Sequence, residues 1–485
     1  MHAESHCGSA LWFFVFWKKK ILSFFKIMHR LKYDCIMESP SNKNLIKETI
    51  KMAWPAVLES VFIQLAGMID TLMVSALGTY AVSAVGLTVQ PKFIALAPFI
   101  AITIAVSALV ARRRGQDRRD EANRIMVTAI VFSTIACALI TVLSIAFMDP
   151  VIRWCGSNAD THAPAILYFQ IIQGGMIFNV LSIVINAAQR GSGNTRIAMT
   201  TNVTSSVVNI IFNYLLIEGH FGFPALGLRG AAIATVFGTA VACGMSFWSL
   251  FHISSYVSLP YLIKEKIYPR VRLLWEILKF SANLLMENLA MRIGFMYTAL
   301  IAARLGTDAF AAHNVAMNFL GVTFAFGDGM QVAAVALIGR SLGEQNPAKA
   351  KQYGSICQRI GLVISLCISA VLLAGGKALF SLFFKDPAIL EMGVVLCRYL
   401  VVIDIFQISQ IIYAGCLRGA GDVKFTMFVS LISVALIRTA VTWLLTSVIP
   451  LGITGIWLGI LADQVSRFTL FSIRFRKGDW TALEL

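Results

Sequence analysis

The amino-acid sequence predicts an all-α polytopic membrane protein with twelve transmembrane helices in two six-helix pseudo-symmetric bundles. Three observations predict this class: the composition, twelve apolar stretches of membrane-spanning length, and motifs that occur twice. Of the 485 residues, 58% are hydrophobic and 14% are charged, whereas soluble proteins contain about 25% charged residues. A chain this apolar cannot cover itself with a polar surface, so we expect it to be surrounded by lipid.

The distribution of charges and cysteines argues against a nucleic-acid-binding protein and against a cysteine metal site. The net charge of +16 would suit nucleic acid, but Lys and Arg cluster in short segments between apolar stretches, as membrane topology requires. The nine cysteines are scattered without the spacing of a metal site. We interpret them as small apolar residues that face the core or lipid.

Twelve segments have the roughly 20 apolar residues that a helix needs to cross a bilayer core of about 30 Å. Helices are expected because an unpaired backbone group is costly in hydrocarbon. The predicted spans are 52–76, 86–111, 125–147, 165–188, 197–217, 228–252, 273–303, 310–338, 356–375, 392–416, 424–447 and 452–473.

The loops on one side of these spans hold most of the Lys and Arg residues. Arg112, Arg113 and Arg114 follow the second span, and Arg340 follows the eighth. Cytoplasmic loops carry an excess of Lys and Arg, so we expect both termini to be cytoplasmic.

Residues 11–27 form a short apolar run that three lysines interrupt. The run is too short and too charged for a good span, and no signal-peptide cleavage site follows it. It could form a basic amphipathic helix at the interface. Alternatively, translation starts at Met37, which is the interpretation we favour.

An internal repeat relates the two halves of the chain. Residues 77–86 match 305–314, residues 189–193 match 417–421 at the same separation, and Glu59 then corresponds to Glu287. Six spans in each half give both halves the same orientation and relate them by an axis along the membrane normal, a plan found in transporters. The predicted divisions are a cytoplasmic N-terminal segment (1–45), an N-lobe (46–259), a cytoplasmic linker (260–272), a C-lobe (273–475) and a cytoplasmic tail (476–485).

Four carboxylates stand inside the predicted spans: Asp70, Glu287, Asp328 and Asp404. Ionisable residues within spans are functional candidates by default, although a neighbouring arginine could hold any of them as a structural group; Arg292 is the local candidate for Glu287. Glu59 lies near the start of the first span and could be interfacial.

We predict cation coupling at Asp70, Glu287 and Asp404, because a carboxylate in a cavity of low dielectric can hold a proton near neutral pH. With amide and carbonyl oxygens around it, the same group can hold Na⁺, for which Asp70 and Glu287 are the candidate sites. Asp463 and Arg438 lie in the last two spans and are interpreted as a structural ion pair.

Amide side chains accompany these carboxylates. Asn209 and Asn213 are four residues apart and share one helix face, and Gln407 and Gln410 follow Asp404 at intervals of three. Hydrogen bonding between helices is the structural alternative. The predicted cavity-lining residues are Asn209, Asn213, Gln64, Gln407, Gln410 and Asn288.

Segments 70–87, 190–196, 213–235, 305–318 and 417–422 resemble the multidrug and toxic compound extrusion (MATE) transporters, and 213–227 looks most like the NorM branch. The resemblance covers nearly all of 45–475. It implies two six-helix lobes, a V-shaped outward-open state, and cation-coupled efflux of cationic and amphiphilic drugs.

The resemblance also suggests residue roles. Asp70 matches the family's aspartate of the first span, Glu287 the glutamate of the seventh, and Asn209 an asparagine near the N-lobe site. Asn213 stands where some members have a second aspartate. Gln407 aligns with an aspartate of NorM-type members, and Asp404, one turn earlier, is a possible substitute.

The expected function is therefore multidrug efflux by alternating access, with antiport of organic cations against Na⁺ or H⁺. The expected partners are small cationic drugs, a monovalent cation and the lipid bilayer of a bacterial inner membrane, with no nucleic acid, no cofactor besides the coupling ion, and a monomeric state. A lipid-linked saccharide flippase is the alternative; the mostly acidic embedded charges disfavour it. An enzyme is not expected, because metal-binding, G-x-S-x-G and P-loop motifs are missing from the sequence.

Overall fold

The computed structural model describes residues 40–252, 255–381, 383–384 and 386–483. From Lys51 onward the chain forms one compact unit, Lys51–Leu485. The predictions for residues 1–36 and for Met37 lie outside the described residues. Within the described part of the chain, the secondary structure is helical and contains no strand.

The N-lobe helices follow each other through short turns, several of which use a glycine with positive φ, such as Gly78 at 104° and Gly227 at 54°. A side chain would strain the backbone at these two angles. The N-lobe elements are α2 (Pro40–Ser75), α3 (Thr79–Gly115), α4 (Arg119–Ala146), α5 (Met148–Trp154), α6 (Ala159–Gly174), α7 (Met176–Gly191), α8 (Thr195–Ile217), η1 (His220–Gly222) and α9 (Leu228–Leu250), followed by α10 (Leu259–Lys264).

The C-lobe helices repeat this arrangement, with Gly306 and Gly452 in the turns that correspond to Gly78 and Gly227. The continuous helical rod over residues 423–448 changes to π-helix twice along its length, at residues 431–438 and 444–448. The elements are α11 (Val271–Arg304), α12 (Thr307–Gly343), α13 (Pro347–Ser381), α14 (Pro387–Ala420), α15 (Val423–Ser430), η2 (Leu431–Arg438), α16 (Thr439–Trp443), η3 (Leu444–Val448), α17 (Ile453–Lys477) and η4 (Asp479–Ala482).

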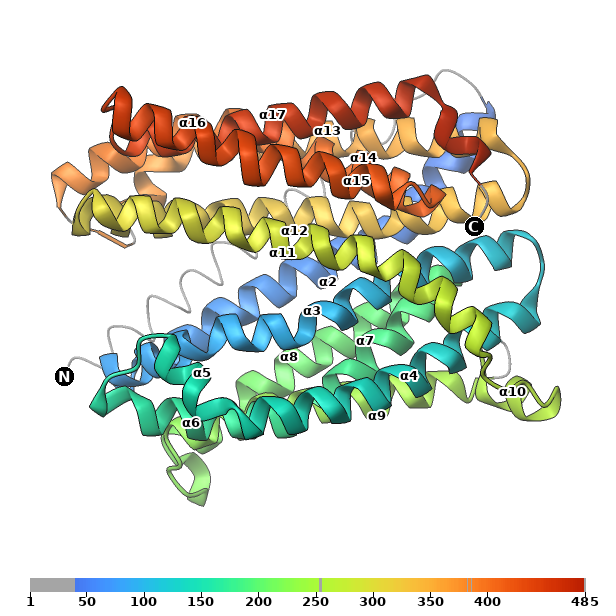
Figure 1. The fold of residues 1–485 in the computed structure, drawn as a ribbon, viewed down its shortest axis with the longest axis horizontal. Helices are drawn as coiled ribbons and strands as arrows, with labels where there is room; N and C mark the ends of the chain where they lie inside the picture. Colours follow the sequence, from blue (N-terminus) through green and yellow to red (C-terminus); the bar gives the residue numbers. More distant parts are fainter. Residues whose placement is uncertain (1–39, 253–254, 382, 385, 484–485) are drawn as a thin grey trace. The chain divides into compact units, whose positions relative to one another are not determined.

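Each of the twelve predicted spans corresponds to a helix, a continuous helical rod or a bent helix pair. In the described chain, eight helices are long and apolar enough to cross a membrane by themselves, and α6 with α7 forms a ninth span that is bent by 44°. The predicted fifth, tenth and twelfth spans correspond to α8, α14 and α17, which also contain 23 or more residues each. Figure 1 shows these helices lying lengthwise beside one another.

Two glycines allow the lobes to approach closely where α3 meets α12. A Cβ atom on Gly115 would collide with the backbone carbonyl of Arg340, and one on Gly343 would collide with that of Arg112. The internal repeat pairs Gly115 with Gly343, so the contact is reciprocal. Only glycine permits this backbone-to-backbone packing of the two helices.

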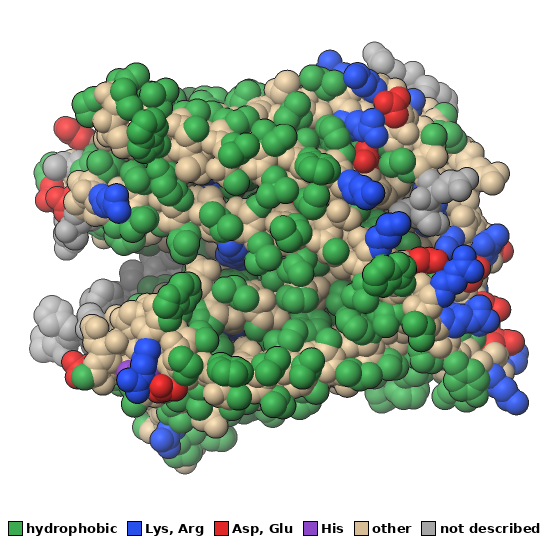
Figure 2. Space-filling view, viewed as in Figure 1, with side chains coloured by type: hydrophobic (Ala, Val, Ile, Leu, Met, Phe, Trp, Pro, Cys, Tyr) green, Lys and Arg blue, Asp and Glu red, His purple; other side chains and the backbone are tan. Residues whose placement is uncertain are grey.

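Lys and Arg side chains gather at one end of the helices. The turns after α3 and α12, together with α10, lie at the right-hand end of Figure 1, and the blue side chains concentrate there in Figure 2. Between the two ends, the visible face is mainly hydrophobic. This distribution agrees with an apolar belt and with one strongly basic side.

Candidate ion and substrate sites

A buried ion pair occupies the position of Glu59 on α2. Arg190 Nη1 of α7 lies 2.8 Å from Glu59 Oε1, and Asn202 Nδ2 of α8 donates to the same oxygen at 2.6 Å. Glu59 is 4% exposed, so it lies in the protein interior. The arginine and the amide neutralise and fix this carboxylate.

The C-lobe reproduces this arrangement at Glu287 on α11. Arg418 Nη2 of α14 lies 2.8 Å from Glu287 Oε1, and Ser430 and Thr426 of α15 donate at 2.6 and 3.2 Å. Arg418 follows from Arg190, and Ser430 from Asn202, by the separation that relates Glu287 to Glu59. The local candidate Arg292 instead lies over the ring of Phe93, 4.1 Å from its centroid.

Asp328 on α12 lies between these two pairs. The charges of Arg190 and Arg418 both act on Asp328, and the Ser60 hydroxyl of α2 donates to Asp328 Oδ2 at 3.4 Å. Gln331, one turn along α12, accepts a 2.7 Å hydrogen bond from Arg418. Asp328 therefore connects a C-lobe helix to the N-lobe pair.

Asp70 on α2 contacts a line of amide and hydroxyl groups. Asn213 Nδ2 of α8 donates to Asp70 Oδ1 at 2.5 Å and also reaches Asn209 Oδ1 at 3.5 Å. Asn209 then donates to Thr235 Oγ1 of α9 at 3.2 Å. The buried Oδ1 of Asn213 has no partner among the described residues. Carboxylate, amide and hydroxyl oxygens are the donors that a hard cation prefers.

Lys92 on α3 is an embedded charge that the sequence analysis missed. It lies close enough to Asp70 for the two charges to interact, although no ion pair within 4.0 Å joins these two described side chains. Its signal was present in the sequence as a lone lysine within the predicted second span. A lysine at the centre of a bilayer costs about 2.5–3.5 kcal/mol on insertion scales.

Asp404 on α14 differs from the two glutamates. The residue is 0% exposed, and neither carboxylate oxygen has a hydrogen-bond partner in the described part of the chain. Thr323 of α12 lies beside it and uses its hydroxyl to donate to the Phe319 carbonyl. A buried charge without partners is unfavourable by several kcal/mol, so the site is suited to a proton or a cation.

The amide stripe near Asp404 divides between two neighbouring helices. Gln407 donates to the Leu320 carbonyl of α12 at 3.4 Å, and Gln410 donates to Gln464 of α17 at 3.3 Å. Both residues are 3% exposed. The Oε1 atom of Gln407 has no partner among the described residues, which leaves one further acceptor in the C-lobe interior.

The other two amides predicted to line a cavity, Gln64 and Asn288, are only partly buried. Gln64 of α2 approaches Gly321 of α12, where an added Cβ would lie 3.1 Å from Gln64 Nε2. Asn288 of α11 donates to its own helix at Leu284 and lines a cavity of about 30 Å³ together with Arg292. That cavity lies between α3 and α11.

The predicted pair of Arg438 and Asp463 forms, with 3.8 Å between Nε and Oδ2. Arg467, one turn along α17, holds Asp463 more closely through both carboxylate oxygens, at 2.9 and 2.8 Å. Arg438 also lies over the ring of Phe295 at 4.7 Å. These contacts agree with the interpretation of Arg438 and Asp463 as a structural ion pair, which Arg467 extends.

The described residues contain no group of three or more His, Cys, Asp or Glu side chains that could hold a metal ion. A monovalent cation can also be held by one carboxylate with neighbouring amide and hydroxyl oxygens. Asp70 with Asn213, Asn209 and Thr235 fits this description.

Comparison with known proteins agrees with this architecture. The MatE family model matches residues 55–215 and 284–444, one segment in each lobe. The probable multidrug resistance protein NorM of Thermotoga maritima is 29% identical over 438 residues, which are 90% of this chain and 93% of the relative. The uncharacterized transporter YisQ of Bacillus subtilis is 23% identical over 92% of this chain and 96% of its own length.

Solved structures agree in fold. A multidrug resistance MATE family transporter of the MOP superfamily, in an outward-facing conformation, superposes with a TM-score of 0.83 at 21% identity, over 91% of this chain and 99% of its own. A MOP superfamily transporter from Pyrococcus furiosus, described as having a binding pocket of reversed polarity, gives 0.82 at the same identity and coverage. The predicted twelve-helix fold is confirmed. Because the family model matches more than half of the sequence, this chain belongs to the MatE family.

Proposed function

We propose that this protein exports organic cations and amphiphilic drugs across a bacterial inner membrane, in exchange for Na⁺ or H⁺, by alternating access of its two lobes. The name of the Thermotoga maritima relative, which matches over nearly its full length, supports multidrug export. The concentration of Lys and Arg at one end of the helices supports an orientation with both termini in the cytoplasm. The protein then acts as a monomer that binds drug, cation and lipid.

The observation that carries the coupling proposal is the state of Asp404. This carboxylate is fully buried, forms no ion pair with a described residue, and has only the hydroxyl-bearing Thr323 side chain beside it in the described structure. Its negative charge becomes tolerable when a proton or cation neutralises it. Loading and release of that ion would change the charge inside the C-lobe, and such a change can bias one conformation over another.

Asp70 is the second coupling residue in this proposal. Its amide and hydroxyl neighbours supply oxygens for Na⁺, and no arginine pairs with it in the described structure. Glu287 was predicted as a third coupling residue. Its contacts with Arg418, Ser430 and Thr426 favour a permanently paired carboxylate instead, and we therefore assign coupling to Asp404 and Asp70.

A lipid-linked saccharide flippase is not favoured. Several curated relatives that match most of this chain carry multidrug-resistance names. Neither Asp70 nor Asp404 suits a pyrophosphate group, because a carboxylate repels an anionic substrate.

Proteoliposomes with the purified full chain test this proposal. A fluorescent organic cation such as ethidium would be followed while a Na⁺ gradient or a pH gradient is imposed separately. We expect uphill movement of the cation under at least one gradient and none in protein-free vesicles. Lack of any driven movement under both gradients would contradict antiport.

A further inference from the structure

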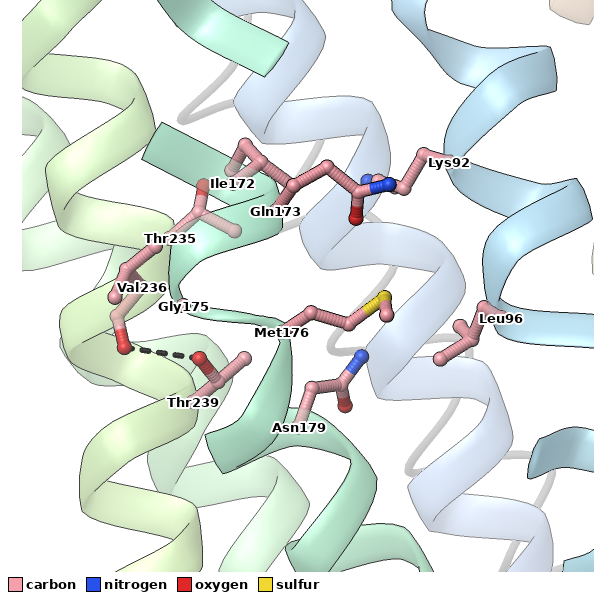
Figure 3. A pocket seen from close by; sticks show the side chains of 10 residues that line it. All are labelled: Lys92, Leu96, Ile172, Gln173, Gly175, Met176, Asn179, Thr235, Val236 and Thr239. Atoms are coloured by element: carbon pink, nitrogen blue, oxygen red, sulfur yellow. Dashed lines mark hydrogen bonds between the residues drawn. The ribbon is translucent and has the colours of Figure 1, made fainter. Parts of the chain in front are cut away.

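A cavity of about 60 Å³, lined by apolar side chains together with a few polar ones, lies inside the N-lobe, where the fourth span breaks at Gly175. Gly175 allows the bend to approach α9, because an added Cβ would lie 2.5 Å from Val236. Figure 3 shows side chains from α3, α6, α7 and α9 around the cavity. Broken helices of this kind surround the substrate sites of many transporters.

Gln173 on α6 is the unexplained group in this cavity. It is 0% exposed, and both Nε2 and Oε1 have no hydrogen-bond partner in the described part of the structure. The great majority of buried polar groups are hydrogen-bonded, so such a group calls for a specific explanation. An amide that faces a cavity without a protein partner is available to a ligand or to water.

Lys92 supplies a positive charge to the same space. Figure 3 shows Lys92 and Gln173 pointing toward each other, whereas the amide of Asn179, which also lines the cavity, lies on the other side of the Met176 side chain. Among the described residues, Lys92 makes no hydrogen bond and no ion pair. At this place the cavity offers an ammonium group and an amide NH₂ group as donors, a set that suits a carboxylate.

Thr235 connects this cavity to Asp70. Thr235 lines the cavity, and its hydroxyl accepts the hydrogen bond from Asn209, whose neighbour Asn213 donates to Asp70. A positive group therefore lines the cavity beside Thr235, and a negative group lies at the far end of the hydrogen-bonded line that starts there. Their charges sum to zero, so a ligand that carries one charge of each sign would leave the N-lobe neutral.

We propose that Lys92 and Gln173 form a subsite for the carboxylate of a zwitterionic substrate, whose amine is directed toward Asp70. This inference rests on the proposed function and defines its substrate class. The cavity is large enough for a carboxylate or a few water molecules, since one water needs about 10–15 Å³, but not for a whole drug. The rest of the substrate would extend out of the cavity.

Direct binding separates this inference from the transport proposal. The purified full chain would be titrated with a zwitterionic fluoroquinolone and with its methyl ester, which keeps the amine and removes the negative charge. Lys92→Met and Gln173→Leu would be compared with Lys264→Met, whose ammonium on α10 is exposed. Thermal melting would check that each variant is folded.

We expect the two cavity variants to bind the zwitterion about tenfold or more weakly, because each removes a hydrogen bond to a charged group. Binding of the ester should change less than twofold, and Lys264→Met should match the unaltered protein for both compounds. Equal binding of the zwitterion by all four proteins would overturn the inference and indicate a water-filled cavity. Equal weakening for zwitterion and ester would also overturn it. Failure of ion-driven transport with this binding pattern intact would overturn only the transport proposal.

Discussion

Glu287 and Arg418 form a buried ion pair at 2.8 Å that repeats, in the C-lobe, the 2.8 Å pair of Glu59 and Arg190 in the N-lobe. In both lobes, the glutamate comes from the first helix and the arginine from the end of the fourth span. Buried charges persist when they are paired and hydrogen-bonded. We therefore regard the two pairs as a shared structural element of the lobes. Of the embedded carboxylates without such a pair, Asp70, Asp328 and Asp404, our proposal assigns the ions to Asp70 and Asp404.

Glu287→Gln should destabilise the protein by about 3–5 kcal/mol, because it leaves Arg418 buried without its counter-charge. Thermal unfolding in detergent should show a clear fall in Tm relative to Glu391→Gln, a control at an exposed position on α14. The double variant Glu287→Gln with Arg418→Gln should recover part of the loss. A single variant as stable as the control would mean that the pair is dispensable.

Gly115→Ala should separate α3 from α12, because the new Cβ would collide with the Arg340 carbonyl. We expect loss of most transport activity in proteoliposomes, since this contact holds the lobes together at their basic end. Gly86→Ala is the matched control on the same helix, where an added Cβ meets no atom within 4 Å. If Gly115→Ala and Gly86→Ala transport at the same rate, the close contact has no role in the cycle.

Glu344, directly after α12 and outside the predicted membrane spans, makes a pH-dependent contribution to the stability of the fold. Partial burial tends to raise its pKa, but the hydrogen bond from Lys349 and the charges of Lys349 and Arg340 outweigh burial and hold the pKa below the ordinary value of 4.5. A lowered pKa means that the ionised glutamate stabilises the fold above pH 4.5 and loses this effect as the pH falls through the lower folded-state value.

Glu344→Gln should therefore lower Tm modestly at pH 7, and the difference from the unaltered protein should shrink below pH 4.5. Melting curves between pH 7 and 4 would follow this convergence. A constant difference across the range would show that the charge of Glu344 is not its cause.

Asn213→Asp should strengthen cation binding at Asp70, because it places a second carboxylate at the position that now donates to Asp70. A ligand that binds the folded state raises its stability in proportion to ln(1 + [L]/Kd). We expect a larger rise of Tm with added NaCl, compared with choline chloride, than in the unaltered protein. Asn158→Asp, at an exposed position before α6, should leave the salt response unchanged; an identical response in Asn213→Asp would argue against a cation at Asp70.

The sequence predicted the spans and the repeat well, because apolar length and repeated glycine motifs are local signals. It also placed Asn209 and Asn213 on one helix face, but the contact of this face with Asp70 required the structure. The partner of Glu287 was not predictable from local spacing, because Arg418 lies 131 residues away in the chain. The structure shows that Arg190 pairs with Glu59, and the internal repeat then identifies Arg418 as the corresponding partner of Glu287.

Two features of the candidate site needed the structure. Lys92 is visible in the sequence as a lone charge in an apolar run, but its proximity to Gln173 depends on how α3 packs against the break between α6 and α7. The amides Gln407 and Gln410 look like one stripe, yet they bond to different helices, α12 and α17. Spacing along one helix cannot tell which neighbour each side chain meets.

The most direct test of ion coupling is the response of Asp404→Asn to an imposed ion gradient. Proteoliposomes would compare two activities: exchange of labelled for unlabelled substrate without a gradient, and uphill movement driven by whichever Na⁺ or pH gradient drives the unaltered protein. Asp160→Asn, at an exposed position on α6, serves as the control. We predict that Asp404→Asn keeps the exchange and loses the driven movement; an undiminished driven movement in this variant would contradict coupling at Asp404.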